Sequence, residues 1–255
     1  AAGAAGVTDA ARLDDADLER RFGGLRRLHG DAAYQRLRGL RLAVVGLGGV
    51  GSWAVEALGR SGVAGLVLID LDHVAESNIN RQVQATGRTL GQAKGQALAE
   101  RLADIHPGCA VEVVDAFVEP GNWPALLPGE DDGLIDACDQ VRAKLALASW
   151  ARAQGVALVC CGAAGGKQRP ERLEIDDLSA VTHDPLLASL RQRLRREPGV
   201  PRQGRLGVRC VFSREPVAPP AEACATDGSL NCHGYGSSVT VTASMGLAAA
   251  AELMR

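Results

Sequence analysis

The sequence has 255 residues, of which 46% are hydrophobic and 23% are charged, enough to bury the core of one large α/β domain. Its 28 basic residues nearly balance its 30 acidic ones, and the formal charge of −2 excludes attraction of nucleic acid or an anionic membrane by a whole-molecule field. The hydrophobic content is too high, and the net charge too low, for a disordered chain.

The elements are expected in a regular alternation. Residues 1–20 are rich in alanine and acids, and we expect them to form a tail before a single domain over residues 21–255. The predicted elements are, in chain order, helix Arg21–Leu37, strand Arg41–Gly46, helix Ser52–Ser61, strand Leu66–Asp70, helix Gly91–Ile105, strand Ala110–Val114, strand Leu134–Ala137, helix Arg142–Ala153 and strand Val156–Cys160. This alternation predicts a Rossmann-like, doubly wound, mostly parallel sheet with helices on both faces.

The pattern changes after about residue 163. The elements expected there are strand Leu173–Asp177, helix Asp184–Arg196 and strand Gly207–Phe212. We interpret residues 166–237 as a basic, substrate-facing excursion from the sheet, which rejoins the nucleotide core of residues 40–165 through the C-terminal segment. The excursion has no linker that would make it a separate domain.

The C-terminal run Val239–Met254 is the longest weakly polar stretch, with 16 residues diluted by Ser, Thr, Gly and Ala. A membrane helix needs about 20 strongly apolar residues, so we expect this run to form a strand followed by a helix in the core. The first 11 residues have neither the basic start nor the apolar centre of a signal peptide. These features predict a cytoplasmic protein with no membrane partner.

The seven cysteines are odd in number and irregularly spaced, in a chain that is long for a disulfide scaffold. No C-x-x-C pair occurs, so the sequence predicts no zinc site. Cys138, Cys160 and Cys161 lie at predicted strand ends, where we interpret them as packing residues. Cys224 or Cys232, in a polar stretch rich in Gly and Ser, is the better candidate for a reactive thiol, and neither is assigned a catalytic role.

A glycine-rich turn joins the first predicted strand to the next helix. Gly46, Gly48, Gly49 and Gly51 form the pattern G-x-G-G-x-G. Glycine lets the backbone turn tightly and approach phosphate, while the helix N-terminus supplies free N–H groups. Asp70 lies 19 residues after the last of these glycines, where an acid meets ribose hydroxyls in dinucleotide-binding folds. The pattern predicts a ligand that contains adenosine, with a ligand-free tight turn as the alternative.

Charged residues beyond this strand favour a triphosphate over NAD. Asp72 is a second acid at the same corner, Arg81 follows in the segment Ser77–Gln82, and Lys94 opens the next helix. An Arg and a Lys that converge here would neutralise a triphosphate while a carboxylate attacks its α-phosphate. Asp139 follows the fourth strand, at the carboxyl end of the sheet, and is a candidate for holding magnesium on the phosphates. The alternatives are solvated charges for Arg81 and Lys94 and a helix N-cap for Asp139.

Over roughly residues 20–165, the sequence resembles the ThiF/MoeB/HesA superfamily, relatives of ubiquitin-activating enzymes that adenylate carboxylates. The residues that carry the resemblance are Arg21-Phe22-Gly23-Gly24, Gly46–Gly51, Asp70, Asp72, Ser77-Asn78, Arg81, Lys94 and Asp139. The resemblance implies that ATP and Mg²⁺ are cofactors and that Asp139 holds the metal. The expected ATP-binding residues are Gly46, Gly48, Gly49, Gly51, Asp70, Asp72, Asn78, Arg81, Gln82 and Lys94. Arg81, Lys94 and Asp139 are thereby implied to be catalytic, and a monovalent cation is a further candidate cofactor.

Within this superfamily, the sequence is similar to the tRNA threonylcarbamoyladenosine dehydratases. The matching segments are Arg21–Gly30, Gly48–Trp53, Asn78–Gln82, Gly162–Gly166, Asp184–Leu186, Leu206–Val208 and Val211–Ser213. The implied reaction is ATP-dependent cyclisation of N6-threonylcarbamoyladenosine in tRNA through an adenylated carboxylate, with net loss of water. One alternative is an adenylyltransferase for a ubiquitin-like sulfur carrier, although the zinc cysteines frequent in those relatives are absent. The other is a Rossmann module that binds NAD or has no catalytic role.

The resemblance also implies partners. The family is usually dimeric, so a homodimer is expected. In sulfur-carrier adenylyltransferases, an N-terminal arginine reaches the partner subunit's nucleotide; Gly24 takes its place here, which leaves Arg21, Arg27 or no residue for this role. A cysteine desulfurase or sulfur-acceptor system is a further partner that the family suggests.

The excursion is unusually rich in arginine. Eight arginines and one acid, Glu197, lie between positions 191 and 214. Guanidinium groups suit phosphate, so this stretch is a candidate tRNA-binding face, with a solvated helix face and a mobile loop as the alternative. Its candidate residues are Arg191, Arg193, Arg195, Arg196, Arg202 and Arg205. Tyr235 or His233 is a candidate for stacking on a base, although both types are more often simple surface residues.

Overall fold

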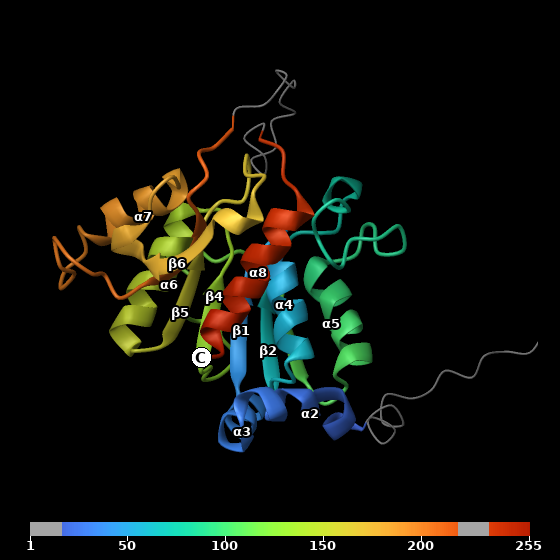
Figure 1. Ribbon diagram of the computed structural model, residues 1–255. Helices are drawn as coiled ribbons and strands as arrows, with labels where there is room; N and C mark the ends of the chain where they lie inside the picture. The colour runs from blue at the N-terminus through green and yellow to red at the C-terminus, as the bar shows by residue number, and fades with distance from the viewer. Residues whose placement is uncertain (1–16, 219–234) are drawn as a thin grey trace, which may run out of the picture.

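The computed structural model describes residues 17–218 and 235–255 (Figure 1). In these ranges the strands are β1 (Arg41–Val45), β2 (Gly65–Ile69), β3 (Ala110–Val114), β4 (Gly133–Asp136), β5 (Ala157–Cys161), β6 (Leu173–Asp177) and β7 (Arg209–Ser213). The α-helices are α2 (Leu18–His29), α3 (Asp31–Gly39), α4 (Gly51–Arg60), α5 (Lys94–Ile105), α6 (Val141–Gln154), α7 (Pro185–Leu194) and α8 (Val239–Leu253). The strands and helices predicted for the nucleotide core are present, close to their predicted bounds.

The strands form one sheet in the order β3-β2-β1-β4-β5-β7-β6. Every neighbouring pair is parallel except β6 and β7, which confirms the mostly parallel, doubly wound fold. The strand order reverses between β1 and β4, where Val45 pairs with Ile69 on one side and with Asp136 on the other. In open α/β sheets such a reversal leaves a crevice at the carboxyl ends of the strands, where ligands bind.

The two faces of the sheet carry separate hydrophobic cores, because successive strand residues point to opposite faces. Leu42 and Val44 of β1 face the core beneath α4, α5 and α8, whereas Ala43 and Val45 face the core beneath α6 and α7. Figure 1 shows these two helical layers, with α2 and α3 lying across the amino ends of β1 and β2. The alternation explains why the central strands read as continuous apolar runs in the sequence.

The region beyond β5 differs from its expected form. β7 pairs with β5 in parallel and β6 pairs with β7 antiparallel, so both strands extend the sheet, and only the connections leave it. An antiparallel edge strand on a parallel sheet is common in large sheets, and strand patterning alone does not reveal it.

The weakly polar C-terminal run is one helix, α8, so the expected strand before the helix is wrong. Small residues let α8 lie directly on α4: an added Cβ at Gly246 would approach the backbone nitrogen of Ala54 to 2.8 Å. No described helix is both long enough and apolar enough to span a membrane.

The N-terminal helices also differ from the predicted single helix. α2 begins at Leu18, inside the predicted tail, because the Asp17 carboxylate accepts a hydrogen bond from the backbone N–H of Arg20 at 2.9 Å. Gly30, with φ of +80°, separates α2 from α3. The left-handed conformation at this position favours glycine and ends the first helix.

His106 follows α5 and is buried beneath α2, edge-on to the ring of Phe22 at 4.7 Å. Its Nε2 lies 3.1 Å from the carbonyl oxygen of Val63 and 3.1 Å from the guanidinium of Arg38. Burial and the positive charge of Arg38 lower the pKa of His106 to about 4. The imidazole is therefore neutral in the folded protein at neutral pH.

We expect the free energy of unfolding to fall by about 3 kcal/mol as the pH drops from about 6.5 to about 4. The unfolded chain takes up the His106 proton first because the folded-state pKa is the lower one, so acid favours unfolding in this window. Urea titrations across the window measure the effect, and His106→Gln should flatten the curve. An equally steep curve in the variant would assign the pH dependence to other groups.

Candidate functional site

The residues predicted to bind a nucleotide meet at one end of the sheet, where the parallel strands have their carboxyl ends. The glycine-rich turn follows β1, Asp70 follows β2, and Asp139 follows β4. Because β1, β2 and β4 are parallel neighbours, their carboxyl ends bring these segments together. Lys94, the first residue of α5, joins them through a backbone hydrogen bond of 3.0 Å to the carbonyl of Asp72.

Glycine occupies each of these positions of the turn for a different structural reason. Gly46 has φ of +85°, and an added Cβ would lie 2.8 Å from the backbone nitrogen of Cys138. At Gly51 an added Cβ would overlap the carbonyl oxygen of Gly46, so both positions need glycine for the fold itself. Around Gly48 the nearest atom, on Gln82, is 4.0 Å away. Gly48 is thus the glycine of this turn that leaves open space where phosphate could approach.

Asp70 is buried, and its carboxylate shapes the glycine-rich turn. One oxygen accepts a hydrogen bond of 2.6 Å from the backbone N–H of Leu47, and the other accepts one of 2.9 Å from the N–H of Asp72. The carboxylate therefore links the turn after β1 to the segment after β2. A bound ribose would meet a carboxylate that is already fixed by the backbone.

Lys94 and Asp72 form an ion pair of 2.8 Å, with the lysine side chain only 6% exposed and the aspartate 33% exposed. A solvated lysine on a helix surface is therefore excluded. The ammonium lies at the start of α5 beside Asp72, and the backbone N–H of Asp72 shares the Asp70 carboxylate with the glycine-rich turn, so a cation is held at the corner where the sequence predicts phosphate.

The segment after the 3₁₀ turn η1 (Glu76–Asn78) is fixed by its own hydrogen bonds. The Asn78 side chain accepts from the backbone N–H of Ala75 at 2.9 Å, which leaves its amide NH₂ as a donor. The Arg81 guanidinium donates to the Ser77 carbonyl at 2.8 Å, and the Cδ of the same side chain lies beside Gly49, 3.3 Å from an added Cβ there. This segment thus brings Arg81 to the glycine-rich turn, whereas the bonds of Asn78 fix the segment itself.

Two buried glutamines line the same segment. Gln84 donates to the carbonyl of Leu47 at 2.9 Å and to the side-chain oxygen of Gln82 at 3.3 Å. Gln82 was among the predicted ATP-binding residues, whereas Gln84 was not. Its position two residues after the Asn-Arg-Gln motif offered no distinct signal, because its role is to hold the loop backbone.

Asp139 is exposed beyond the end of β4. α6 begins at Val141 with Gln140 as its N-cap residue, so a helix-capping role for Asp139 is excluded. The described residues contain no cluster of three or more His, Cys, Asp or Glu side chains placed to hold a metal. Magnesium on a nucleotide needs only one or two carboxylates, because water and phosphate oxygens complete its shell. A single exposed carboxylate at this edge therefore fits a magnesium–nucleotide.

A buried ion pair that the sequence analysis did not predict lies at the end of β4, where the turn toward Asp139 begins. Lys144 of α6 donates to Asp136 at 3.1 Å and to the carbonyl of Cys161 at 2.7 Å, and both charged side chains are fully buried. Burial alone would lower the pKa of Lys144, but the Asp136 carboxylate raises it well above its ordinary value, so the ammonium stays charged. The thiols of Cys138 and Cys160 hydrogen-bond to Asp136 at 2.9 and 3.1 Å, a more specific role than the packing predicted for them.

A sequence signal for this pair did exist. The chain's basic residues are almost all arginines, and its lysines are Lys94, Lys144 and Lys167. All three are buried, with exposed fractions of 5%, 0% and 2%. Lysine is almost never fully buried unless it is paired, so the choice of lysine in an arginine-rich chain marks special positions.

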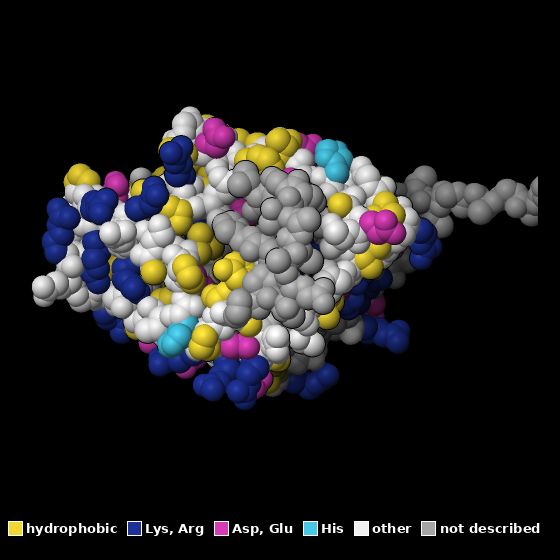
Figure 2. All heavy atoms as spheres, turned by 90° about the horizontal axis from the view of Figure 1, so that it is seen from above, with side chains coloured by type: hydrophobic (Ala, Val, Ile, Leu, Met, Phe, Trp, Pro, Cys, Tyr) yellow, Lys and Arg dark blue, Asp and Glu magenta, His cyan; other side chains and the backbone are white. Residues whose placement is uncertain are grey.

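The eight arginines between positions 191 and 214 fall into two groups: those bound to carbonyls or carboxylates of the protein, and exposed ones. Arg191 donates to the carbonyls of Leu178 and Val181, and Arg195 donates to those of Pro201 and Gly204. Arg202 donates to the Arg195 carbonyl, and Arg209 and Arg214 form ion pairs with Glu252 and Glu174. Arg193, Arg196 and Arg205 are exposed. Figure 2 shows basic side chains gathered at the end of the molecule that carries α7.

The remaining candidates lie elsewhere. Arg21 donates to the carbonyls of Asp104 and Ile105 at the end of α5, and Arg27 is exposed on α2, so both lie at the sheet edge opposite the glycine-rich turn. Cys224, Cys232 and His233 lie outside the described residues. Tyr235 lies near Gly165, where an added Cβ would be 3.5 Å from its Cβ.

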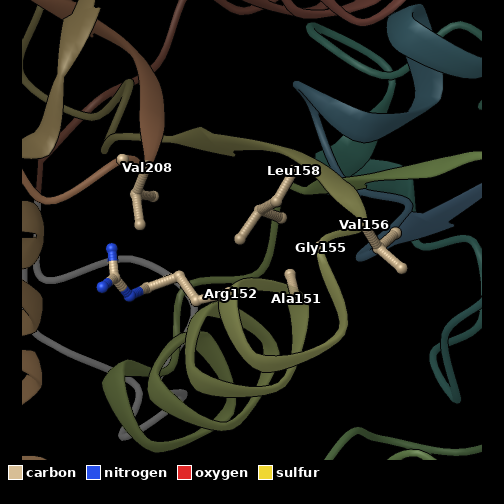
Figure 3. A pocket seen from close by; sticks show the side chains of 7 residues that line it. Ala151, Arg152, Gly155, Val156, Leu158 and Val208 are labelled. Carbon is tan, nitrogen blue, oxygen red and sulfur yellow. The ribbon is translucent and has the colours of Figure 1, made fainter. Parts of the chain in front are cut away.

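Two cavities lie away from the glycine-rich turn. One, of about 320 Å³, lies at the amino ends of β5 and β7, where Arg152 of α6 points toward Val208 (Figure 3). It is thus at the end of the sheet opposite the glycine-rich turn. The other, of about 460 Å³, lies between the start of α7 and Pro216–Val217, beyond the carboxyl end of β7.

The doubly wound sheet, with the glycine-rich turn at the carboxyl ends of its central strands, defines a Rossmann-like nucleotide-binding protein. A model of the ThiF family matches residues 20–255, so the chain belongs to the ThiF family. The tRNA threonylcarbamoyladenosine dehydratase of Haemophilus influenzae is 38% identical over 254 residues, which cover 98% of this chain and 97% of that relative. That of Escherichia coli is 40% identical over 247 residues, which cover 92% of each chain.

Solved structures agree with these relatives. The E. coli tRNA N6-threonylcarbamoyladenosine dehydratase in complex with ATP is 40% identical, with a TM-score of 0.85 over 94% of both chains. Its complex with AMP is 39% identical, with a TM-score of 0.84 over 98% of this chain and 96% of that one. The E. coli molybdopterin-synthase adenylyltransferase is 35% identical over 125 residues only, 49% of this chain and 50% of that relative.

Proposed function

We propose that this protein catalyses the ATP-dependent cyclisation of N6-threonylcarbamoyladenosine in tRNA, a dehydration that proceeds through an adenylated carboxylate. The observation that carries the proposal is the similarity to the dehydratases along almost the whole chain, including the segments beyond β5. Similarity to the sulfur-carrier type of adenylyltransferase is limited to about half the chain, so that alternative is less well supported. The ATP and AMP complexes of the relative favour adenylate chemistry over an NAD-binding module.

The chemistry explains the use of ATP. A threonyl carboxylate is a poor acyl donor because oxide is a poor leaving group. Its oxygen attacks the α-phosphorus of ATP, pyrophosphate leaves, and a mixed anhydride with AMP forms. The neighbouring carbamoyl group then attacks the activated carbonyl, AMP leaves and the ring closes, with an effective molarity on the order of 10⁵ M or more. The substrate has lost one water in total, and the reaction needs no covalent cysteine.

The site residues have distinct proposed roles. Gly48 leaves room for phosphate beside the N-terminus of α4, and Asp70 contacts the ribose while it holds the glycine-rich turn. Lys94 and Arg81 neutralise the negative charge that grows on the phosphates in the transition state. Asn78 donates its free NH₂ group to the nucleotide. Asp139 would hold a magnesium ion, which supplies further charge neutralisation when bound with the nucleotide.

The tRNA would be held by exposed arginines rather than by all the predicted ones. Arg193, Arg196 and Arg205 are exposed at the α7 end of the molecule, whereas Arg191, Arg195 and Arg202 support loop backbone through carbonyl contacts. The near-neutral total charge therefore hides a local basic surface that binds phosphate without reading sequence.

Replacing Arg193, Arg196 and Arg205 by Gln is expected to weaken tRNA binding and to lower its salt dependence by about 2 to 3 units of log–log slope. ATP affinity should not change. The control variant replaces Arg20, Arg36 and Arg255, which are exposed on α2, on α3 and at the C-terminus and carry the same charge. Filter-binding titrations at several salt concentrations measure the slope, and equal slopes in both variants would rule out this surface as the tRNA-binding face.

We further propose a cytoplasmic homodimer that uses Mg²⁺, in keeping with the family resemblance. Arg21 or Arg27 would have to act on a partner subunit, because both lie at the edge opposite their own nucleotide site. A sulfur-acceptor partner and a monovalent cation remain proposals for which the described residues offer no specific contact.

The direct test is a nucleoside assay. The protein is incubated with ATP, Mg²⁺ and tRNA that carries threonylcarbamoyladenosine, and nucleosides are analysed under mild conditions. We expect the modified nucleoside to lose the mass of one water with release of AMP and pyrophosphate. An unchanged nucleoside with protein that binds ATP would refute the proposal, and ATP–pyrophosphate exchange that depends on a ubiquitin-like protein would support the alternative.

A further inference from the structure

The Lys144–Asp136 pair lies beneath the turn that leads to Asp139, at a position unfavourable for a cation. Both side chains are 0% exposed, and the ammonium is surrounded by Asp136, the thiol of Cys160 and the carbonyl of Cys161. Lys144 is the fourth residue of α6, near the helix N-terminus, where the helix dipole disfavours positive charge. Apolar residues of similar volume often replace a buried ion pair without loss of stability. The pair therefore requires an explanation other than stability.

The pair determines the geometry of the turn. Asp136 accepts a hydrogen bond of 3.2 Å from the backbone N–H of Cys138, two residues on, which closes the turn after β4. The N–H of Ala137 donates to the carbonyl of Val45 at 2.8 Å. The same turn packs on Gly46, at which no Cβ would fit. The Asp136 carboxylate thus fixes the backbone that leads to Asp139. The Ala137–Cys138 peptide of the same turn lies against Gly46, the first glycine of the glycine-rich turn.

We infer that Lys144 is a positioning residue: through Asp136 it fixes the turn after β4 and thereby orients Asp139 toward the metal–nucleotide. This inference rests on the proposed function. Because Lys144 is fully buried, it acts through Asp136 and not by contact with ATP. Loss of a group that supports a metal ligand typically lowers metal affinity or activity about 10–100-fold.

The test measures metal binding separately from turnover. Mn²⁺ replaces Mg²⁺ as a probe, and its binding to the protein–ATP complex is measured by electron paramagnetic resonance. We expect Lys144→Met to weaken Mn²⁺ binding about 10–100-fold and to raise the Mg²⁺ concentration needed for cyclisation similarly. ATP affinity in the presence of a chelator should be unchanged.

Two further variants separate positioning from stability. Lys144→Met alone leaves Asp136 buried and unpaired, so its melting temperature should fall. Asp136→Asn combined with Lys144→Met removes both charges, and should recover melting temperature without recovering Mn²⁺ affinity. Leu147→Ala, a cavity variant of a fully buried residue on the same helix, should lower the melting temperature and keep wild-type Mn²⁺ affinity.

The outcomes are distinguishable. Recovery of both melting temperature and Mn²⁺ affinity in the double variant would show that the pair only supports the fold, and would overturn the inference. Wild-type Mn²⁺ affinity in a folded Lys144→Met protein would overturn it as well. If Lys144→Met does not fold, the Mn²⁺ affinity of the double variant tests the inference in its place. A wild-type protein that binds ATP and Mn²⁺ but does not cyclise the nucleoside would refute the proposed function and leave the positioning of Asp139 open to the same measurement.

Discussion

Asp139→Ala is expected to lower the rate of cyclisation about 10²–10³-fold with no change in melting temperature. The side chain is exposed and does not cap α6, so the fold does not depend on it. Its carboxylate is the one we assign to the magnesium ion that neutralises charge on the phosphates. Single-turnover release of AMP from ATP and modified tRNA measures the effect, and differential scanning fluorimetry checks the fold.

A matched control for Asp139 is Glu100→Ala, which removes an exposed carboxylate from the surface of α5. This variant should keep wild-type activity. Titration with Mg²⁺ adds a second readout, because loss of a metal contact that only weakens affinity is compensated by excess metal. Activity of Asp139→Ala equal to wild type at ordinary Mg²⁺ would remove the metal assignment.

Lys94→Met is expected to lower kcat/KM for ATP about 10²–10³-fold. Lys94 is a buried cation at the corner that we propose binds phosphate, and methionine keeps the length of its side chain but removes the charge. The partner carboxylate, Asp72, is 33% exposed and can be solvated when its ion pair is lost. The variant should therefore fold, and steady-state kinetics with varied ATP measure its defect.

A double variant shows whether Lys94 acts on ATP or on Asp72. If Lys94 only neutralises Asp72, then Asp72→Asn combined with Lys94→Met should regain most of the lost activity. If Lys94 binds phosphate, the double variant should remain as slow as Lys94→Met. Recovery to wild-type rates would contradict the phosphate role. Asp72→Asn alone should be milder, because it leaves the ammonium in place.

The sheet was predictable because its strands are short, buried on both faces and separated by amphipathic helices. Strand Ala110–Val114 has the predicted bounds, and each of the other strands of the nucleotide core differs by one residue at one end or at both ends. Strand β6 also has its predicted bounds, Leu173–Asp177, but its edge position and its antiparallel pairing with β7 were not predictable, because strand direction is set by the connection that returns the chain and not by residue pattern. α8 was misread because its small residues suit close helix packing and give little helical periodicity.

The site was predictable in outline for a topological reason. Segments that follow parallel strands must meet at one edge, so residues after β1, β2 and β4 were expected to converge, and they do. Individual contacts were not predictable. The bonds from Asp70 to Leu47 and Asp72, and from Lys94 to Asp72, join residues 2 to 23 positions apart, and their geometry depends on the packed loops.

The sequence by itself determined which segments meet at the carboxyl end of the sheet and indicated the family, because both depend on local motifs placed after consecutive strands. Composition also showed an excess of arginine, but only the tertiary structure separated Arg193, Arg196 and Arg205 from the arginines that support backbone carbonyls. It likewise decided that Lys144 is buried against Asp136 rather than exposed to solvent. The reason is physical: sequence gives the charge of a side chain, whereas burial and partners arise only when distant segments pack together.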